Sequence, residues 1–135
     1  MDRVLGIDYG DSRVGIALSD PLRIIAKPFK TLTNNSELLS QLRLLIDEQN
    51  IIELVVGYPI NMKGLKTKQT EKVDIFINIL TREFKLKITK IDERLSSVSA
   101  KSLLIQQGIK TGHNKSQIDE TSAAIILQEF LDKKV

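Results

Sequence analysis

The chain has 135 residues, of which 41% are hydrophobic and 27% are charged, a composition typical of one soluble globular domain spanning residues 1–135. It contains no cysteine and one histidine, which excludes disulfides, thiolate metal sites and sites built on several imidazoles, so oxygen ligands must hold any metal. The net charge of +3 permits a nucleic-acid partner. No apolar run approaches the roughly 20 residues of a membrane span, which favours a cytoplasmic location.

The beginning of the chain is predicted to form three strands. Residues 4–8 (VLGID) are a short apolar run, residues 9–12 supply turn formers, and residues 14–19 (VGIALS) complete a β-hairpin. A third strand is expected within residues 24–31. There Pro28 favours an edge position, because proline cannot donate a hydrogen bond to a neighbouring strand.

Helices and strands alternate in the remainder of the chain. Residues 36–49 carry apolar residues at helical spacing, and Asn34 with Glu37 three residues later resembles a capping box. The later predicted elements are a buried strand over 52–57, a Gly- and Lys-bearing loop over 58–68, a helix over about 69–84, a strand over 86–91, a helix from Ser96 or Ser97 to Gln107, a polar loop over 110–117 and a helix over about 118–131. This order favours an α/β fold with a mixed sheet whose first, fourth and fifth strands are parallel and central.

Two carboxylates stand at strand ends. Asp8 ends the first predicted strand, and Glu93 follows the fifth. Ligands of open α/β sheets collect at the carboxyl ends of parallel strands, so these side chains are candidates for one site. An acidic residue at a strand end is equally often a turn former or a cap for the next helix, but the pair together favours a ligand site.

A third carboxylate, Asp119, stands near the start of the last predicted helix, where the helix dipole alone favours an acidic residue. The apolar side of that helix carries Ala123, Ala124 and Ile126. This pattern predicts that Asp119 faces the sheet and that Glu120 points away from it.

Three converging carboxylates repel one another, and such a group is typical of a site for Mg²⁺ or Mn²⁺. A bound divalent cation promotes in-line hydrolysis of a phosphodiester by activating water and stabilising the leaving oxygen. The sequence therefore predicts that Asp8, Glu93 and Asp119 are catalytic metal ligands.

Contacts with nucleic acid are expected to go mainly to the phosphate backbone, because only 4% of the residues are aromatic. Gly10 leaves room for a phosphate to approach the backbone, Ser12 adds a hydroxyl, and Arg94 is a candidate phosphate ligand. Further basic candidates in the loops are Lys63, Lys66, Lys68 and Lys115. A solvated face for the lysines and a structural ion pair for the arginine remain open.

Four segments carry a resemblance, namely GIDYGDSRVGIALSD (6–20), VVGYPINMKG (55–64), DERLSSVSA (92–100) and NKSQIDETSAAIILQEFL (114–131). They resemble the YqgF family of Holliday-junction-resolvase-like proteins, also described as pre-16S ribosomal RNA nucleases. The resemblance implies a ribonuclease H-like fold with a central five-stranded sheet in the order 3-2-1-4-5, flanked by helices. It implies a metal-dependent nuclease, with processing of the 5' end of pre-16S ribosomal RNA ranked first.

The resemblance places the family's acidic triad on the three carboxylates chosen above. It also places polar positions of the family on Asn61, Gly64, Arg94, Ser96 and Ser97. The chain departs from the family pattern at Lys63, where an acidic or amide residue is usual, at Ser99 and at Ser116 and Gln117. These departures lie in loops that would meet nucleic acid, so they leave the choice of substrate open.

Three other functions remain open. A Holliday junction resolvase uses the same metal chemistry on DNA and would normally be a two-fold dimer, whereas this chain is expected to be a monomer or a weak homodimer. A non-catalytic RNA-binding or transcription-elongation factor is a second alternative, which the intact triad disfavours. The segment GIDYGDS also resembles the phosphate-binding hairpin of actin-like ATPases and sugar kinases, but those enzymes need two such domains.

Overall fold

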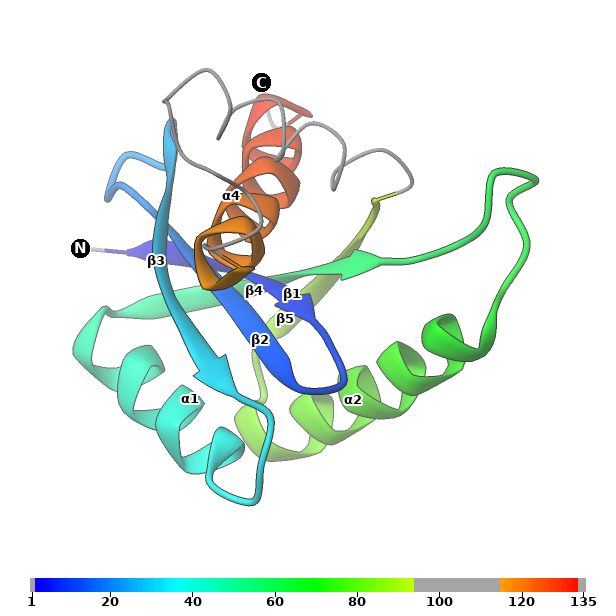
Figure 1. The fold of residues 1–135 in the computed structure, drawn as a ribbon. Coiled ribbons are helices and arrows are strands. Elements are labelled where there is room, and N and C mark those ends of the chain that lie inside the picture. The colour runs from blue at the N-terminus through cyan, green and yellow to red at the C-terminus, as the bar shows by residue number, and fades with distance from the viewer. Residues whose placement is uncertain (1, 94–114, 134–135) are drawn as a thin grey trace.

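The computed structural model describes residues 2–93 and 115–133 of the chain. Its sheet has five strands in the order β3-β2-β1-β4-β5, which confirms the order that the resemblance implies. The strands are β1 (Arg3–Tyr9), β2 (Arg13–Ser19), β3 (Ala26–Thr33), β4 (Ile51–Tyr58) and β5 (Lys87–Asp92). β1 pairs antiparallel with β2 and parallel with β4, so the predicted hairpin begins in the middle of the sheet (Figure 1).

The edge strand β3 carries Pro28, as predicted, and pairs only with β2. On the other side of the sheet β5 pairs parallel with β4. The carboxyl ends of β1, β4 and β5 therefore lie at the same end of the sheet.

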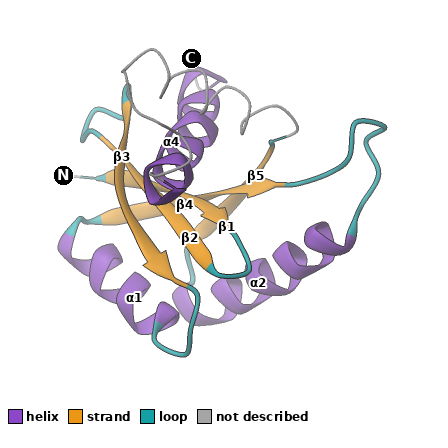
Figure 2. Ribbon diagram, viewed as in Figure 1, coloured by secondary structure: helices purple, strands orange, loops and turns teal. Residues whose placement is uncertain are grey.

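Helices cover both faces of the sheet (Figure 2). α1 (Leu38–Glu48) and α2 (Lys68–Phe84) lie together on one face, and α4 (Lys115–Lys133) crosses the other face over β1, β2 and β3. Among the described residues, no helix is long and apolar enough to cross a membrane. The helix predicted from Ser96 or Ser97 to Gln107 lies outside the described residues.

Alternate residues of β1 feed two separate hydrophobic cores. Leu5 and Ile7 are fully buried against α1 and α2, whereas Val4 is fully buried against α4. Because side chains of a strand alternate between the two faces, Asp8 lies on the same face as Val4. The first candidate carboxylate therefore points to the α4 side of the sheet.

The start of α1 differs from the predicted capping box. Glu37 is the N-cap residue and makes no side-chain capping bond. Asn34 instead donates a hydrogen bond from Nδ2 to the Gly10 carbonyl at 2.8 Å, and the Asn35 side chain accepts from the Glu37 amide at 2.9 Å. The predicted cap is wrong because the β1–β2 turn, distant in sequence, competes for the Asn34 side chain.

α4 begins earlier than predicted, since residues 115–117 are helical rather than part of a loop. Lys, Ser and Gln are all tolerated in helices, and no glycine or proline interrupts this stretch. The predicted apolar residues of α4 are all buried, namely Ala123, Ala124, Ile126, Leu127 and Leu131, and Phe130 is buried with them.

Candidate active site

Asp8 occupies the carboxyl end of β1, on the face covered by α4. Its side chain is hydrogen-bonded to that of Glu93, and the negative charge of Asp119 also acts on it. Burial, together with the negative charge of Asp119, raises the pKa of Asp8 to about 6, although the hydrogen bond to Glu93 opposes the rise. The three predicted carboxylates therefore interact electrostatically in the folded protein.

Glu93 follows the last residue of β5, and its amide donates to the Tyr58 carbonyl at 3.3 Å. Its carboxylate lies directly over Gly57 of β4. Burial raises the pKa of Glu93 to about 9, with further contributions from the Asp8 charge, the hydrogen bond to Asp8 and the charge of Asp92. Asp8 and Glu93 therefore form a buried pair that retains a proton at neutral pH, because two adjacent carboxylates resist being charged together.

Asp119 is brought to this pair by close packing of α4 on the hairpin. Its backbone carbonyl lies against Gly15 of β2, so closely that a side chain at position 15 would overlap it. Gly15 in turn pairs with Asp8 in the β1–β2 register. The missing side chain at Gly15 thus lets the first turns of α4 approach the strand end that carries Asp8.

Arg13 is a site residue that was not predicted from the sequence, and its Nε donates to Asp119 Oδ2 at 2.6 Å. Arg13 begins β2 and stands two residues before Gly15, on the same face of the sheet. The predicted second strand began at residue 14 and left Arg13 out. Alternation along β2 places Arg13 on the face of Gly15, and the β1–β2 register places Gly15 beside Asp8. What the alternation could not show is the partner on α4.

Glu120 differs from Asp119 in its neighbours rather than in its exposure, since both are partly buried. Burial raises the pKa of Glu120, and the adjacent Asp119 adds to the rise. The charge of Asp119 contributes to the raised pKa of Asp8, whereas Glu120 does not contribute to the pKa shift of Asp8 or of Glu93. This difference is consistent with the prediction that Asp119 is the member of the pair facing the site.

The donor set consists of carboxylate oxygens, which suit a hard divalent cation such as Mg²⁺ or Mn²⁺. Within residues 2–93 and 115–133, no group of three or more His, Asp or Glu side chains is already arranged to hold an ion. Asp8 is bonded to Glu93, and Asp119 is bonded to Arg13. The residues therefore fit a cation in their chemistry, while Asp119 is engaged by Arg13 through one of its two oxygens.

The residues predicted to contact nucleic acid occupy several places. Gly10 and Ser12 form the β1–β2 turn next to the end of β1, and Ser12 is exposed. Asn61 uses its side-chain oxygen within the loop, where it accepts from the amides of Lys63 and Leu65 at 2.9 and 3.0 Å. Asn61 therefore shapes the loop between β4 and α2.

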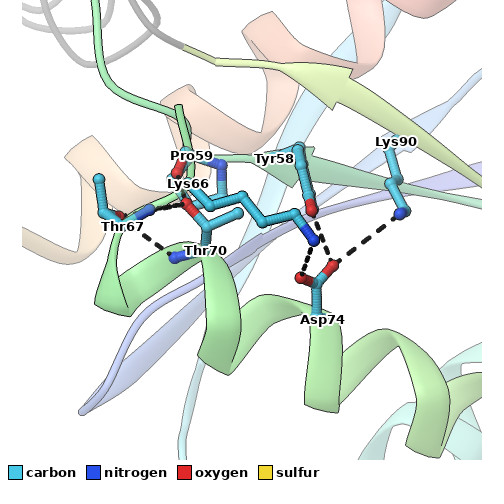
Figure 3. A network of polar contacts seen from close by, with 7 residues as sticks. All are labelled: Tyr58, Pro59, Lys66, Thr67, Thr70, Asp74 and Lys90. Carbon is cyan, nitrogen blue, oxygen red and sulfur yellow. Dashed lines mark hydrogen bonds and ion pairs between the residues drawn. The ribbon is translucent and has the colours of Figure 1, made fainter. Parts of the chain in front are cut away.

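The three lysines predicted in the loop are all exposed, and Lys68 is the first residue of α2 rather than part of the loop. Lys66 differs from the other two because it donates to Asp74 Oδ2 at 3.1 Å (Figure 3). Burial of Asp74 opposes its ionisation, but hydrogen bonds from Tyr58 and Lys66 outweigh this effect and lower the pKa of Asp74. Lys66 thus fastens the loop to α2.

Three predicted contacts remain untested by the structure. Arg94 and Ser97 lie outside the described residues. Lys115 is the first residue of α4, but the description does not extend to its side chain. Their roles, like those of the three carboxylates, stay predictions.

The chain is similar to known nucleases over nearly its whole length. A family model described as "RuvX: Holliday junction resolvase" matches residues 2–133. A "Putative pre-16S rRNA nuclease" of Ruminiclostridium cellulolyticum is 40% identical over 134 residues, covering 97% of this chain and 94% of the relative. A protein of the same description from Acetivibrio thermocellus is 41% identical over 136 residues, covering 98% of this chain and 96% of the relative.

Two solved structures share the fold at low sequence identity. RuvC of T. thermophilus, in complex with a Holliday junction substrate, superposes with a TM-score of 0.61 at 10% identity, covering 98% of this chain and 95% of that chain. The Fowlpox virus Holliday junction resolvase gives a TM-score of 0.61 at 11% identity, covering 98% and 99%. These matches place the sheet and its helices in the ribonuclease H-like fold.

Proposed function

The chain belongs to the RuvX family, which confirms the resemblance to YqgF proteins, and from this membership we propose that it is a metal-dependent nuclease that processes the 5' end of pre-16S ribosomal RNA. As a member of a nuclease family it is an enzyme that hydrolyses phosphodiester bonds. The observation that supports the site best is the convergence of Asp8, Glu93 and Asp119 at one end of the sheet.

The three carboxylates would hold the divalent cation, which supplies Lewis-acid stabilisation of the phosphate and activation of water when bound. The protein contributes the placement of these ligands. Asp8 is fixed by the pairing of β1 with two neighbours, and Glu93 is fixed by its amide bond to Tyr58 and by its position over Gly57. Burial is the main cause of the raised pKa values of Asp8 and Glu93, and a bound cation would compensate the negative charge that burial disfavours.

Structured ribosomal RNA is the proposed substrate because both reported relatives carry that description. The exposed Lys63 and Lys68 and the turn with Gly10 and Ser12 are the proposed contacts to the RNA backbone. Cleavage of a four-way DNA junction is the second candidate, favoured by the description of the family. A monomer or a weak homodimer is proposed for the RNA enzyme, whereas junction resolution calls for two opposed active sites.

A side-by-side cleavage assay tests this proposal. Purified wild-type protein is incubated with a pre-16S RNA fragment and with a four-way DNA junction, each with Mg²⁺, with Mn²⁺ and with EDTA. We expect metal-dependent cleavage of the RNA near the mature 5' end. Asp8→Asn serves as the control for contaminating nuclease, because it removes one charged ligand and little packing. Cleavage of the junction alone would contradict the RNA assignment, and equal activity of Asp8→Asn would contradict the site.

A further inference from the structure

Arg13 is fixed at the edge of the candidate site by the β1–β2 turn. The Gly10 amide donates to its carbonyl at 2.9 Å, which holds the start of β2 in place. From there its Nε reaches Asp119 Oδ2 at 2.6 Å, a short charge-assisted hydrogen bond. A cationic side chain is thus bonded to one of the three carboxylates that would otherwise bind a cation.

This contact and a metal ion compete for the same carboxylate. A guanidinium bonded to Asp119 occupies one of its two carboxylate oxygens, and its positive charge repels a divalent ion nearby. Asp8 and Glu93 already lie together, whereas Asp119 is engaged by Arg13, and no described group of three such residues is arranged around an ion. Release of Asp119 from Arg13 would free both of its oxygens for the cation and would remove the nearby positive charge.

The exchange is feasible because the ion pair is accessible to solvent. The Arg13 side chain is 43% exposed and that of Asp119 is 23% exposed. Exposed ion pairs contribute little to stability, so breaking this one costs little. A guanidinium has five N–H donors in a planar fork that matches a phosphate. Among the described residues, the Arg13 guanidinium makes one hydrogen bond, through Nε to Asp119.

We propose that Arg13 holds Asp119 in the absence of a cation and exchanges it, on cation binding, for a phosphate group of the nucleic-acid strand. This inference rests on the proposed function and assigns Arg13 a phosphate-binding role in it. It couples two binding events: Asp119 would hold the cation, and the released guanidinium would bind the phosphate beside the cleavage site.

The first test measures cation affinity directly, without cleavage. Isothermal calorimetry with Mn²⁺ compares wild type, Arg13→Gln and the control Lys72→Gln. Lys72 of α2 donates to Asp11 of the β1–β2 turn at 3.1 Å. Its substitution therefore removes a positive charge near this turn without removing a partner of Asp119. We expect Arg13→Gln to lower the Mn²⁺ dissociation constant by about two- to fivefold, the factor corresponding to an exposed ion pair given up. Lys72→Gln should leave that constant unchanged.

Weaker Mn²⁺ binding by Arg13→Gln would mean that Arg13 supports Asp119 as a ligand, and it would overturn the exchange. An unchanged constant, or equal tightening in both variants, would overturn it as well. A second measurement follows wild-type protein by NMR, and the variant is needed only to assign the Arg13 signal. The Arg13 Nε–H signal in ¹H–¹⁵N NMR spectra, identified by its loss in Arg13→Gln, should shift during Mg²⁺ titration as the bond to Asp119 breaks. A signal that stays in place at saturating Mg²⁺ would contradict the exchange.

The third measurement concerns the phosphate. RNA affinity is measured in Ca²⁺, chosen as a hard oxygen-ligand cation that limits turnover. Arg13→Gln should lose one phosphate contact, which reduces the log-log salt slope by roughly 0.7 for a single strand; an unchanged slope would contradict the phosphate contact. Failure of the proposed function is distinguishable, because a protein that cleaves neither RNA nor DNA can still show or lack the exchange in calorimetry and NMR.

Discussion

The Glu93 carboxylate lies over Gly57, in space that any larger residue at position 57 would fill. A Cβ atom at this position would overlap Glu93 Oε2 and the Ile126 side chain. Gly57 lies in β4, which pairs with both β1 and β5, so the backbone has little freedom to move away. The position of one candidate ligand therefore depends on the absence of a side chain on the neighbouring strand.

Gly57→Ala is expected to displace the Glu93 carboxylate and to lower kcat about 100-fold, the cost of misplacing a catalytic group by about 1 Å. Steady-state cleavage kinetics with Mg²⁺ measure this effect. Gly6→Ala is the matched control, because its Cβ would lie 2.8 Å from Leu127 Cβ on the same face but away from the carboxylates. A similar loss of kcat in both variants would show that general strain under α4, rather than Glu93, is responsible.

Asp119→Asn and Glu120→Gln are expected to differ strongly in activity. Asp119 interacts with Asp8 and Arg13, so its neutralisation should cost more than the roughly 100-fold loss typical of removing an outer-shell metal partner. Glu120→Gln should retain activity within a few-fold, since Glu120 perturbs neither Asp8 nor Glu93. The two variants are compared by cleavage rate at saturating RNA. Equal losses would mean that the helix presents Glu120 to the site.

The stability of the metal-free protein should fall as the pH rises. In the folded protein the pKa values of Asp8 and Glu93 are raised to about 6 and about 9. In the unfolded chain these two groups release their protons near the ordinary pKa values of 3.8 and 4.5. A state that binds more protons loses stability as the pH rises, so the loss extends from about pH 4 to pH 9. Urea unfolding in EDTA at pH 5 and pH 8 measures it.

Glu93→Gln is the control for this pH dependence, because it removes the repulsion between the two carboxylates. The variant should be more stable than wild type at pH 8 in EDTA, and the difference should shrink at pH 5. Mg²⁺ should stabilise wild type more at pH 8 than at pH 5, since the cation binds the ionised groups. Parallel pH profiles of the two proteins would contradict the shifted pKa values.

Lys63→Ala with Lys68→Ala should weaken RNA binding and flatten its salt dependence. Two lost phosphate contacts reduce the log-log salt slope by about 1.4 for a single strand. Lys66 is left in place because its bond to Asp74 anchors the loop. The control is Lys87→Ala with Lys133→Ala. Both lysines are exposed; Lys87 lies at the end of β5 opposite to Glu93, and Lys133 lies at the end of α4 opposite to Asp119. A slope that responds equally to both pairs would show only a general effect of net charge.

The sequence by itself determined the order of the elements and the strand and helix positions of the three carboxylates. Residue patterns are local, so the hairpin, the edge position of Pro28 and the apolar stripe of α4 could be predicted from residues close together in the sequence. The carboxyl ends of parallel strands meet at one edge for topological reasons, which is why Asp8 and Glu93 were identified as a pair. The triad itself also followed from the resemblance.

Only the tertiary structure decided which groups these side chains bind. Arg13 and Asp119 are 106 positions apart, Asn34 leaves its predicted cap for Gly10, and Lys66 is taken by Asp74. Asn34 and Lys66 had adequate local interpretations, as a cap and a solvated charge, and Arg13 had none. The choice among partners depends on how closely α4 and the loops approach the sheet. For α4 this approach depends on Gly15, where the Asp119 carbonyl occupies the space of the absent side chain, and for Glu93 it depends on Gly57.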